Sequence, residues 1–272
     1  MTANCDQLVQ SRQAPVRAGP GFYVFVATVF TAALALTIYY CRTMSGGMEM
    51  PGGWTMSMMW MPMPGQTWLG STVMFMLMWL AMMVAMMLPS YLPMVLRYHR
   101  ARRSEYDRGV LAWTSLMIAG YFFVWSAVGA VIFLAGIALA IAAMRWTTFS
   151  RSMPFIIAAT IVIAGGMQFM PWTQSGLRQC RGPLACGVSS SRPGAWPAWR
   201  VGIRSWISCV TCCSGPTLVL LALGMMNPAV IVLVTAVIAM EKLMPRPEVI
   251  VRLSGIIAVI AGLIMISRLA LV

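Results

Sequence analysis

The chain has 272 residues, of which 60% are hydrophobic and 9% are charged, whereas about a quarter of the residues in an ordinary soluble domain are charged. Its long apolar runs can each cross a hydrocarbon layer of about 30 Å as a helix, so the composition excludes a soluble domain and predicts an all-α, polytopic transmembrane bundle. The net charge of +13 comes from 18 arginines and one lysine that lie between the apolar runs. Such placement is typical of membrane proteins and argues against nucleic acid as a partner.

Few residues are available for the common enzymatic mechanisms. Six carboxylates and one histidine, His99, leave little for paired-carboxylate hydrolysis, a His-rich zinc site or a Ser-His-Asp arrangement. Sulfur is abundant instead, with 27 methionines and seven cysteines. The odd number of cysteines, without regular spacing, gives no support to a disulfide-stapled secreted fold.

The N-terminal part of the chain is expected to contain a tail, a membrane anchor and a loop. Residues 1–21 are a polar tail, and residues 22–272 are expected to form a single transmembrane helical domain. The first apolar run, residues 22–41, is interpreted as a retained anchor and not a signal peptide, because the tail before it is long. Residues 42–70 contain many glycines and prolines, which predict a loop and forbid a continuous helix.

The later apolar runs differ in length, which decides how many spans they form. Residues 206–244 would make a helix of about 58 Å, so Asn227-Pro228 is expected to turn a hairpin. Residues 110–144 could also form a hairpin, but as one span they leave 15 basic residues on the cytoplasmic side and four outside. Splitting that run would give 10 inside and nine outside. About seven spans and a cytoplasmic N-terminus are therefore predicted. The spans are expected at residues 22–41, 71–95, 110–144, 154–172, the two halves of 206–244, and 249–266. Basic cytoplasmic loops are expected at residues 97–109 and 173–205.

Methionine is concentrated in two consecutive segments. The loop at residues 42–70, on the predicted outer face, has eight methionines between positions 44 and 63. Thioethers are soft ligands that suit Cu(I), although methionine is also a flexible apolar residue that packs easily at interfaces and between helices. In the following span, methionines recur at helical spacing and form a stripe. The candidate metal ligands of this stripe are Met82, Met83, Met86 and Met87.

Three cysteines stand at helical spacing at the start of the fifth predicted span. Cys209 is three residues before Cys212 and four before Cys213, so the three thiols can approach one side of a helix. Such a trio could bind a soft metal or form a dithiol redox pair, and the alternative is that three small residues ease helix packing. Cys180 and Cys186 lie in the preceding basic loop, and either could pass ions to the trio.

Glu241 is the only carboxylate inside a predicted apolar run, near the end of residues 206–244. A carboxylate at membrane depth indicates function, so Glu241 is a further candidate metal ligand. The alternative is that it pairs with Lys242 or extends its carboxylate to the membrane surface.

The chain resembles a bacterial family of predicted metal-binding integral membrane proteins. The likeness rests on three stretches, which are the run MWLAMMVAMMLPSYLPM at residues 78–94, QCRGPL at 179–184, and the cysteine trio followed by a Met-Asn turn and Glu-Lys-Leu-x-Pro. The resemblance implies a metal site in a bacterial inner membrane protein. Gly176 stands where the family has a cysteine, Ser205 and Trp206 where a histidine and a glycine are expected, and Ser214 in place of a tryptophan, so up to two donors are lost.

The sequence thus predicts a multi-pass protein of the bacterial inner membrane that binds a soft metal ion, Cu(I) first, through Met and Cys ligands and moves or inserts it. The lipid bilayer and the metal are its expected partners, together with a membrane complex or a metallochaperone. One alternative is a structural or assembly subunit of a membrane complex, which would hold no metal. Another is a membrane thiol oxidoreductase, in which Cys209 would form a reversible disulfide. A role without catalysis is favoured.

Overall fold

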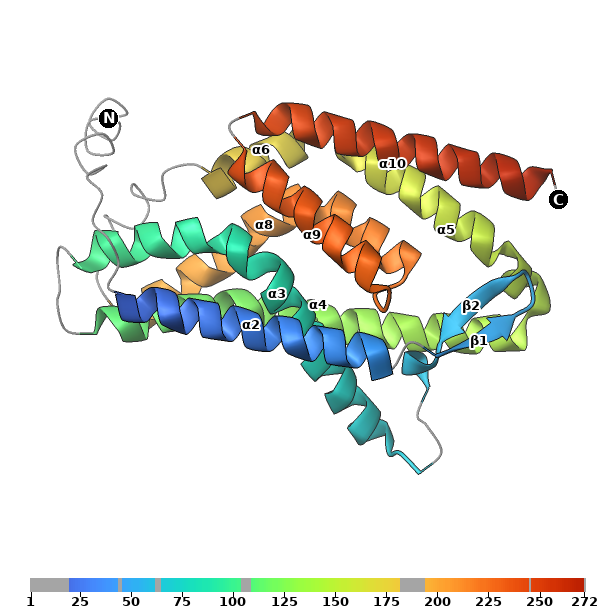
Figure 1. Cartoon of the computed structure of the whole chain (residues 1–272), viewed down its shortest axis with the longest axis horizontal. Helices are drawn as coiled ribbons and strands as arrows, with labels where there is room; N and C mark the ends of the chain where they lie inside the picture. The colour runs from blue at the N-terminus through green and yellow to red at the C-terminus, as the bar shows by residue number, and fades with distance from the viewer. Residues whose placement is uncertain are drawn as a thin grey trace.

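The computed structural model describes residues 20–43, 46–61, 65–103, 109–181, 194–244 and 246–271. Across these ranges the protein is a bundle of α-helices with one small β-hairpin beside it (Figure 1). The predicted all-α membrane bundle is therefore confirmed. The helices are α2 (Pro20–Thr43), α3 (Trp68–Arg103), α4 (Val110–Arg145), α5 (Thr147–Met167), α6 (Pro171–Arg181), α8 (Ala195–Leu223), α9 (Pro228–Leu243) and α10 (Pro247–Ala270).

Six of the described helices are long and apolar enough to cross a membrane, namely α2, α3, α4, α5, α8 and α10. Each of the seven predicted spans contains a helix, and the helix that is not among these six is α9. With 16 residues, α9 is about 24 Å long, which is shorter than the hydrocarbon layer of about 30 Å. Its inward side buries Ile231, Val234 and Ile238 against the rest of the bundle.

Small residues allow the helices to approach each other closely. α10 runs along α5, and α8 packs against α4 and α6 (Figure 1). A Cβ atom added to Gly165 on α5 would lie 2.7 Å from the backbone oxygen of Gly255 on α10. A Cβ added to Gly202 on α8 would collide with the backbone carbonyl of Met117 on α4. Such small-residue contacts replace the hydrophobic effect as the means of helix association in lipid.

The two longest apolar runs fold as expected, with a single helix at residues 110–144 and a hairpin within residues 206–244. Residues 110–145 form the single helix α4 of 36 residues. The run at residues 206–244 is broken between α8 and α9, where Gly224 adopts a φ of 97° that favours glycine. Asn227 then caps α9, because its side-chain oxygen accepts a hydrogen bond from the Ala229 backbone N–H at 3.0 Å, and Pro228 occupies the first turn.

The methionine-rich segment at residues 42–70 contains more regular structure than the expected loop. It forms an antiparallel hairpin of β1 (Gly47–Met50) and β2 (Trp54–Ser57), followed by a short 3₁₀ helix, Met58–Trp60. Gly52 and Gly53, with φ of 111° and 72°, make the turn. The hairpin rests on α5, where the Trp54 indole N–H donates to the Ser150 carbonyl oxygen at 2.9 Å. No continuous helix forms, as the glycines and prolines predicted.

The basic connection expected at residues 173–205 is partly helical. It contains most of α6 and the first turns of α8, which begins at Ala195 and not near residue 206. The described part of α3 is also longer than expected and includes Pro89 and Pro93. Figure 1 shows α3 changing direction along its length, as prolines inside a helix cause.

Candidate metal centre

Three thiols lie together on the inward side of α8. Cys209, Cys212 and Cys213 are each exposed by 2% or less. The Cys212 and Cys213 sulfurs are 3.4 Å apart, and the Cys209 and Cys213 sulfurs are 3.9 Å apart. The spacing of three and four residues produces this convergence, because such positions share one side of a helix.

A fourth thiol comes from α6. The Cys180 sulfur lies 3.7 Å from that of Cys212. One side of α6 faces α8, and Gly176 on this side permits the close approach, because a Cβ there would collide with the Thr211 side chain. Ser208 on α8 also donates a hydrogen bond to the Gln179 side-chain oxygen at 3.0 Å.

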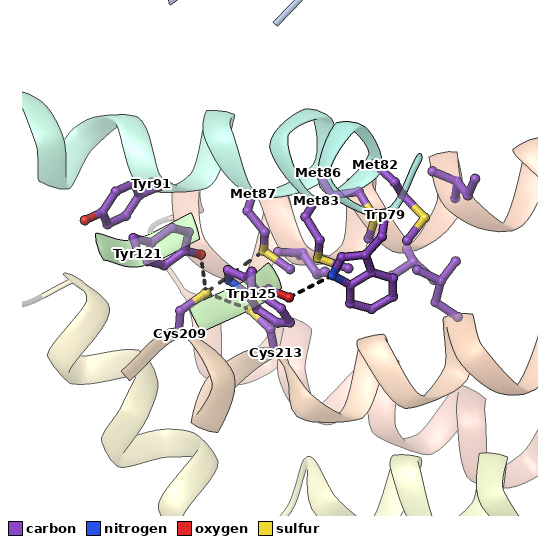
Figure 2. Packing of buried hydrophobic residues seen from close by; sticks show 14 of the residues in the cluster. Trp79, Met82, Met83, Met86, Met87, Tyr91, Tyr121, Trp125, Cys209 and Cys213 are labelled. Carbon is purple, nitrogen blue, oxygen red and sulfur yellow. Dashed lines mark hydrogen bonds between the residues drawn. The ribbon is translucent and has the colours of Figure 1, made fainter. Parts of the chain in front are cut away.

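A thioether from α3 completes the group. The Met87 sulfur lies 4.0 Å from that of Cys209 (Figure 2). Five sulfur atoms, here called the sulfur cluster, therefore follow one another at separations of 3.4 to 4.0 Å in the order Cys180, Cys212, Cys213, Cys209, Met87.

These separations suit a soft metal ion. With metal–sulfur bonds of about 2.3 Å, neighbouring ligands of a tetrahedral site stand about 3.8 Å apart. Within the described residues, however, no three His, Cys, Asp or Glu side chains are already arranged as a metal site. The donor set thus fits a soft ion chemically, and small side-chain rotations are needed to gather the sulfurs around one centre.

Two hydrogen bonds from other helices converge on Cys209. The Lys242 ammonium on α9 donates to the Cys209 sulfur at 3.1 Å, and the Tyr121 hydroxyl on α4 donates to it at 3.0 Å. Lys242 is the one lysine in the chain. A positive charge at this distance favours a thiolate, the form of cysteine that binds metals.

Buried aromatic side chains of α3 and α4 pack beside this part of the cluster. Tyr91 on α3 and Tyr121 stack with ring centroids 4.1 Å apart. The indole N–H of Trp79 donates to the backbone oxygen of Trp125 at 2.8 Å, which ties α3 to α4 (Figure 2). All four side chains are almost completely buried, so water has little access from this side.

The remaining methionine candidates lie further along α3. Met82, Met83 and Met86 are exposed by 1% or less and belong to the same apolar core as the cysteines. Figure 2 shows them following Met87 toward Trp79. Burial in the core is compatible both with a metal path and with simple packing, so their role as ligands stays a prediction.

Glu241 lies in a polar group of its own. Its Oε1 accepts hydrogen bonds from Gln168 on α5 at 3.1 Å and from Ser254 on α10 at 2.9 Å. The expected alternative, a pair with Lys242, is not what the structure has, because the Lys242 ammonium lies on Cys209. Glu241 remains a predicted metal ligand, and its Oε1 already accepts two hydrogen bonds.

Sequence reasoning missed the polar partners of the cluster. Tyr121 was not singled out, and Lys242 was considered as a partner of Glu241 and as part of the Glu-Lys-Leu-x-Pro pattern, but not as a partner of the cysteines. A lone lysine beside a membrane span was the available signal for Lys242, whereas nothing in the sequence distinguished Tyr121 from six other tyrosines. Of the positions where the resemblance implies a missing donor, Gly176 packs against α8 beside Cys212, and buried Ser205 donates to the Val201 backbone oxygen at 2.6 Å. Cys186 lies outside the described residues.

Comparison with known families adds an independent finding. A family model described as a copper chaperone, PpoB2, matches residues 76–265, which is more than half of the chain. The chain belongs to this copper chaperone family. The matched region holds all five residues of the sulfur cluster and both partners of Cys209, whereas the β-hairpin and α2 lie before it. No curated protein and no solved structure matches the chain.

Proposed function

We propose that this member of the copper chaperone family binds Cu(I) at the sulfur cluster, inside the membrane, and passes or inserts it into a partner. The observation that carries the proposal is the unbroken series of five sulfur atoms from α6 through α8 to α3, with separations of 3.4 to 4.0 Å. Thiolate and thioether sulfur are the ligands that select Cu(I).

Charge supports this choice of cargo. Cu(I) held by two thiolates has a net charge of −1, and an uncompensated charge is costly in an apolar interior. The Lys242 ammonium, 3.1 Å from the Cys209 sulfur, would bring the total to zero. The Tyr121 hydroxyl would supply a hydrogen bond to the same sulfur.

The arrangement also suits movement of the ion better than storage. Conduction needs several sites, each of which an ion can leave. In the proposed order Cu(I) would exchange between sulfurs within the cluster, and the buried methionines of α3 would extend the path toward Trp79. The final acceptor would be a membrane complex or a soluble metallochaperone.

The proposal is tested by titrating detergent-purified full-length protein with Cu(I) under reducing conditions, in competition with a coloured Cu(I) chelator. The wild type is expected to hold copper against the chelator. The double variant Cys209→Ser and Cys213→Ser should lose this ability while keeping its helical circular dichroism spectrum. Cys41→Ser is the matched control, because Cys41 is buried on α2, outside the cluster, and should bind as the wild type does.

Three results would contradict the proposal. Copper binding that survives in the double variant would place the site elsewhere. A wild type that holds no copper would favour a packing role, and reversible formation of a disulfide at Cys209 without any metal requirement would favour the oxidoreductase alternative.

A further inference from the structure

We propose that Cys180 on α6 is the thiol through which Cu(I) is exchanged, and that the basic surface around it receives the ion from an anionic, thiolate-bearing donor. This inference rests on the proposed function, since it assigns the access route to the same cluster.

Exposure differs along the sulfur cluster. Cys180 is half-buried, whereas Cys209, Cys212 and Cys213 are exposed by 2% or less. Cys180 also directly contacts the trio, since its sulfur is 3.7 Å from that of Cys212. Among the cysteines of the cluster, Cys180 is therefore the one that a donor outside the bundle can reach.

The position of α6 explains this difference. Leu177 and Gly176, on the side of α6 that faces α8, are buried, and Cys180 follows them at helical spacing, at the edge of the contact. A short helix of 11 residues thus carries one thiol at the margin of the bundle and holds it against the buried trio.

The surface beside Cys180 is basic. Arg178 lies two residues away, with 76% of its side chain exposed, and its ion pair with Glu248 at 3.4 Å is on the surface, where such pairs contribute little. Arg200 and Arg204 on α8 are also exposed. Arg204 lies one turn before Ser208, which bonds Gln179 next to Cys180. These exposed arginines on α6 and α8 outnumber the one carboxylate paired with them, Glu248, and this excess of positive charge favours an anionic donor.

The proposed step is a ligand exchange without a change of oxidation state. The Cys180 sulfur forms a bond to Cu(I) as the bond between Cu(I) and the donor thiolate breaks, and the Cys180 proton passes to the departing thiolate. Cu(I) then shifts to Cys212 by a second exchange across 3.7 Å, in which the bond to the Cys180 sulfur breaks and the Cys212 proton passes to Cys180.

The test follows the rate of Cu(I) transfer to the full-length protein in detergent from two small donors. The Cu(I)–glutathione complex has an anionic thiol ligand, and the Cu(I)–cysteamine complex has a cationic one. Cys180→Ser is expected to slow transfer about tenfold or more, and to weaken the equilibrium affinity measured against the chelator by a smaller factor, because the trio still holds the ion. Arg204→Glu should slow transfer from glutathione and speed transfer from cysteamine.

A matched control and three contrary outcomes keep this test separate from that of the proposed function. Arg268→Glu changes the net charge equally but lies near the C-terminal end of α10, away from α6 (Figure 1), so it should leave both rates unchanged. If Cys180→Ser receives Cu(I) at the wild-type rate, the exchange role of Cys180 is overturned, but copper binding by the trio is not. If the equilibrium affinity of that variant falls by as large a factor as its transfer rate, Cys180 acts as a permanent ligand, and the exchange role is also overturned. If Arg204→Glu slows Cu(I) transfer from both donors equally, the proposed preference for an anionic donor is overturned.

Discussion

The β-hairpin and the sulfur cluster both bury sulfur, but in different surroundings. In the hairpin, Met50 and Met56 pack against small residues of α4 and against aromatic rings, which are Ala140, Ala143, Trp54, Trp60 and Phe149. In the cluster, each sulfur has another sulfur within 4.0 Å. The copper chaperone family match begins at residue 76 and so includes the cluster but not the hairpin. In the proposed function, the convergence of sulfurs from separate helices marks the metal site, and not the density of methionine in one segment.

The largest single effect is expected for Cys212→Ser, because Cys212 touches both Cys180 and Cys213 and joins the two ends of the cluster. Cu(I) affinity should fall by more than about 100-fold, as for loss of a direct ligand. Competition with a chelator measures this, and thermal unfolding checks that the fold survives. A fall smaller than that caused by Met87→Leu would show that Cys212 is not central.

Lys242→Gln is expected to have the next largest effect. The substitution keeps an unbranched side chain but removes the charge that lies 3.1 Å from the Cys209 sulfur. Cu(I) affinity should fall about 10- to 100-fold, as is typical when a residue supporting a metal ligand is removed. Lys242→Arg, which keeps the charge, should recover most of it. Equal losses in both variants would mean that Lys242 acts through packing and not through its charge.

A smaller effect on affinity is expected when Met82 and Met86 are both changed to leucine. Leucine and methionine have similar volumes, so the free energy of unfolding should fall by less than about 1.5 kcal/mol. If these thioethers form part of the path, copper transport into vesicles should slow although the sulfur cluster is intact. Unchanged transport would support packing as the role of the α3 methionines.

The smallest effect is expected in the hairpin. Met50→Leu with Met56→Leu preserves apolar contacts with α4, so stability should change by less than about 1.5 kcal/mol. Cu(I) affinity should equal that of the wild type in the chelator titration. A fall comparable to that of Cys212→Ser would erase the difference drawn between the two regions and move the site to the hairpin.

The sequence by itself determined the membrane class, the approximate helices and the cysteine trio. Apolar runs of about 20 residues specify helices because lipid offers no hydrogen-bonding partner to the backbone, and the turn at Asn227-Pro228 follows from local chemistry. The trio converges because Cys209, Cys212 and Cys213 share one side of a single helix. All of these features depend on residues close together in the chain.

Only the tertiary structure decided which distant residues join the trio. Cys180, Met87, Tyr121 and Lys242 come from α6, α3, α4 and α9, and their contacts with α8 join residues 32 to 122 positions apart. Helical periodicity cannot predict such contacts, because they depend on how helices pack, for example on the close approach that Gly176 permits between α6 and α8. For the same reason the sequence suggested an ion pair between Lys242 and its neighbour Glu241, whereas in the fold the Lys242 ammonium donates a hydrogen bond to the Cys209 sulfur.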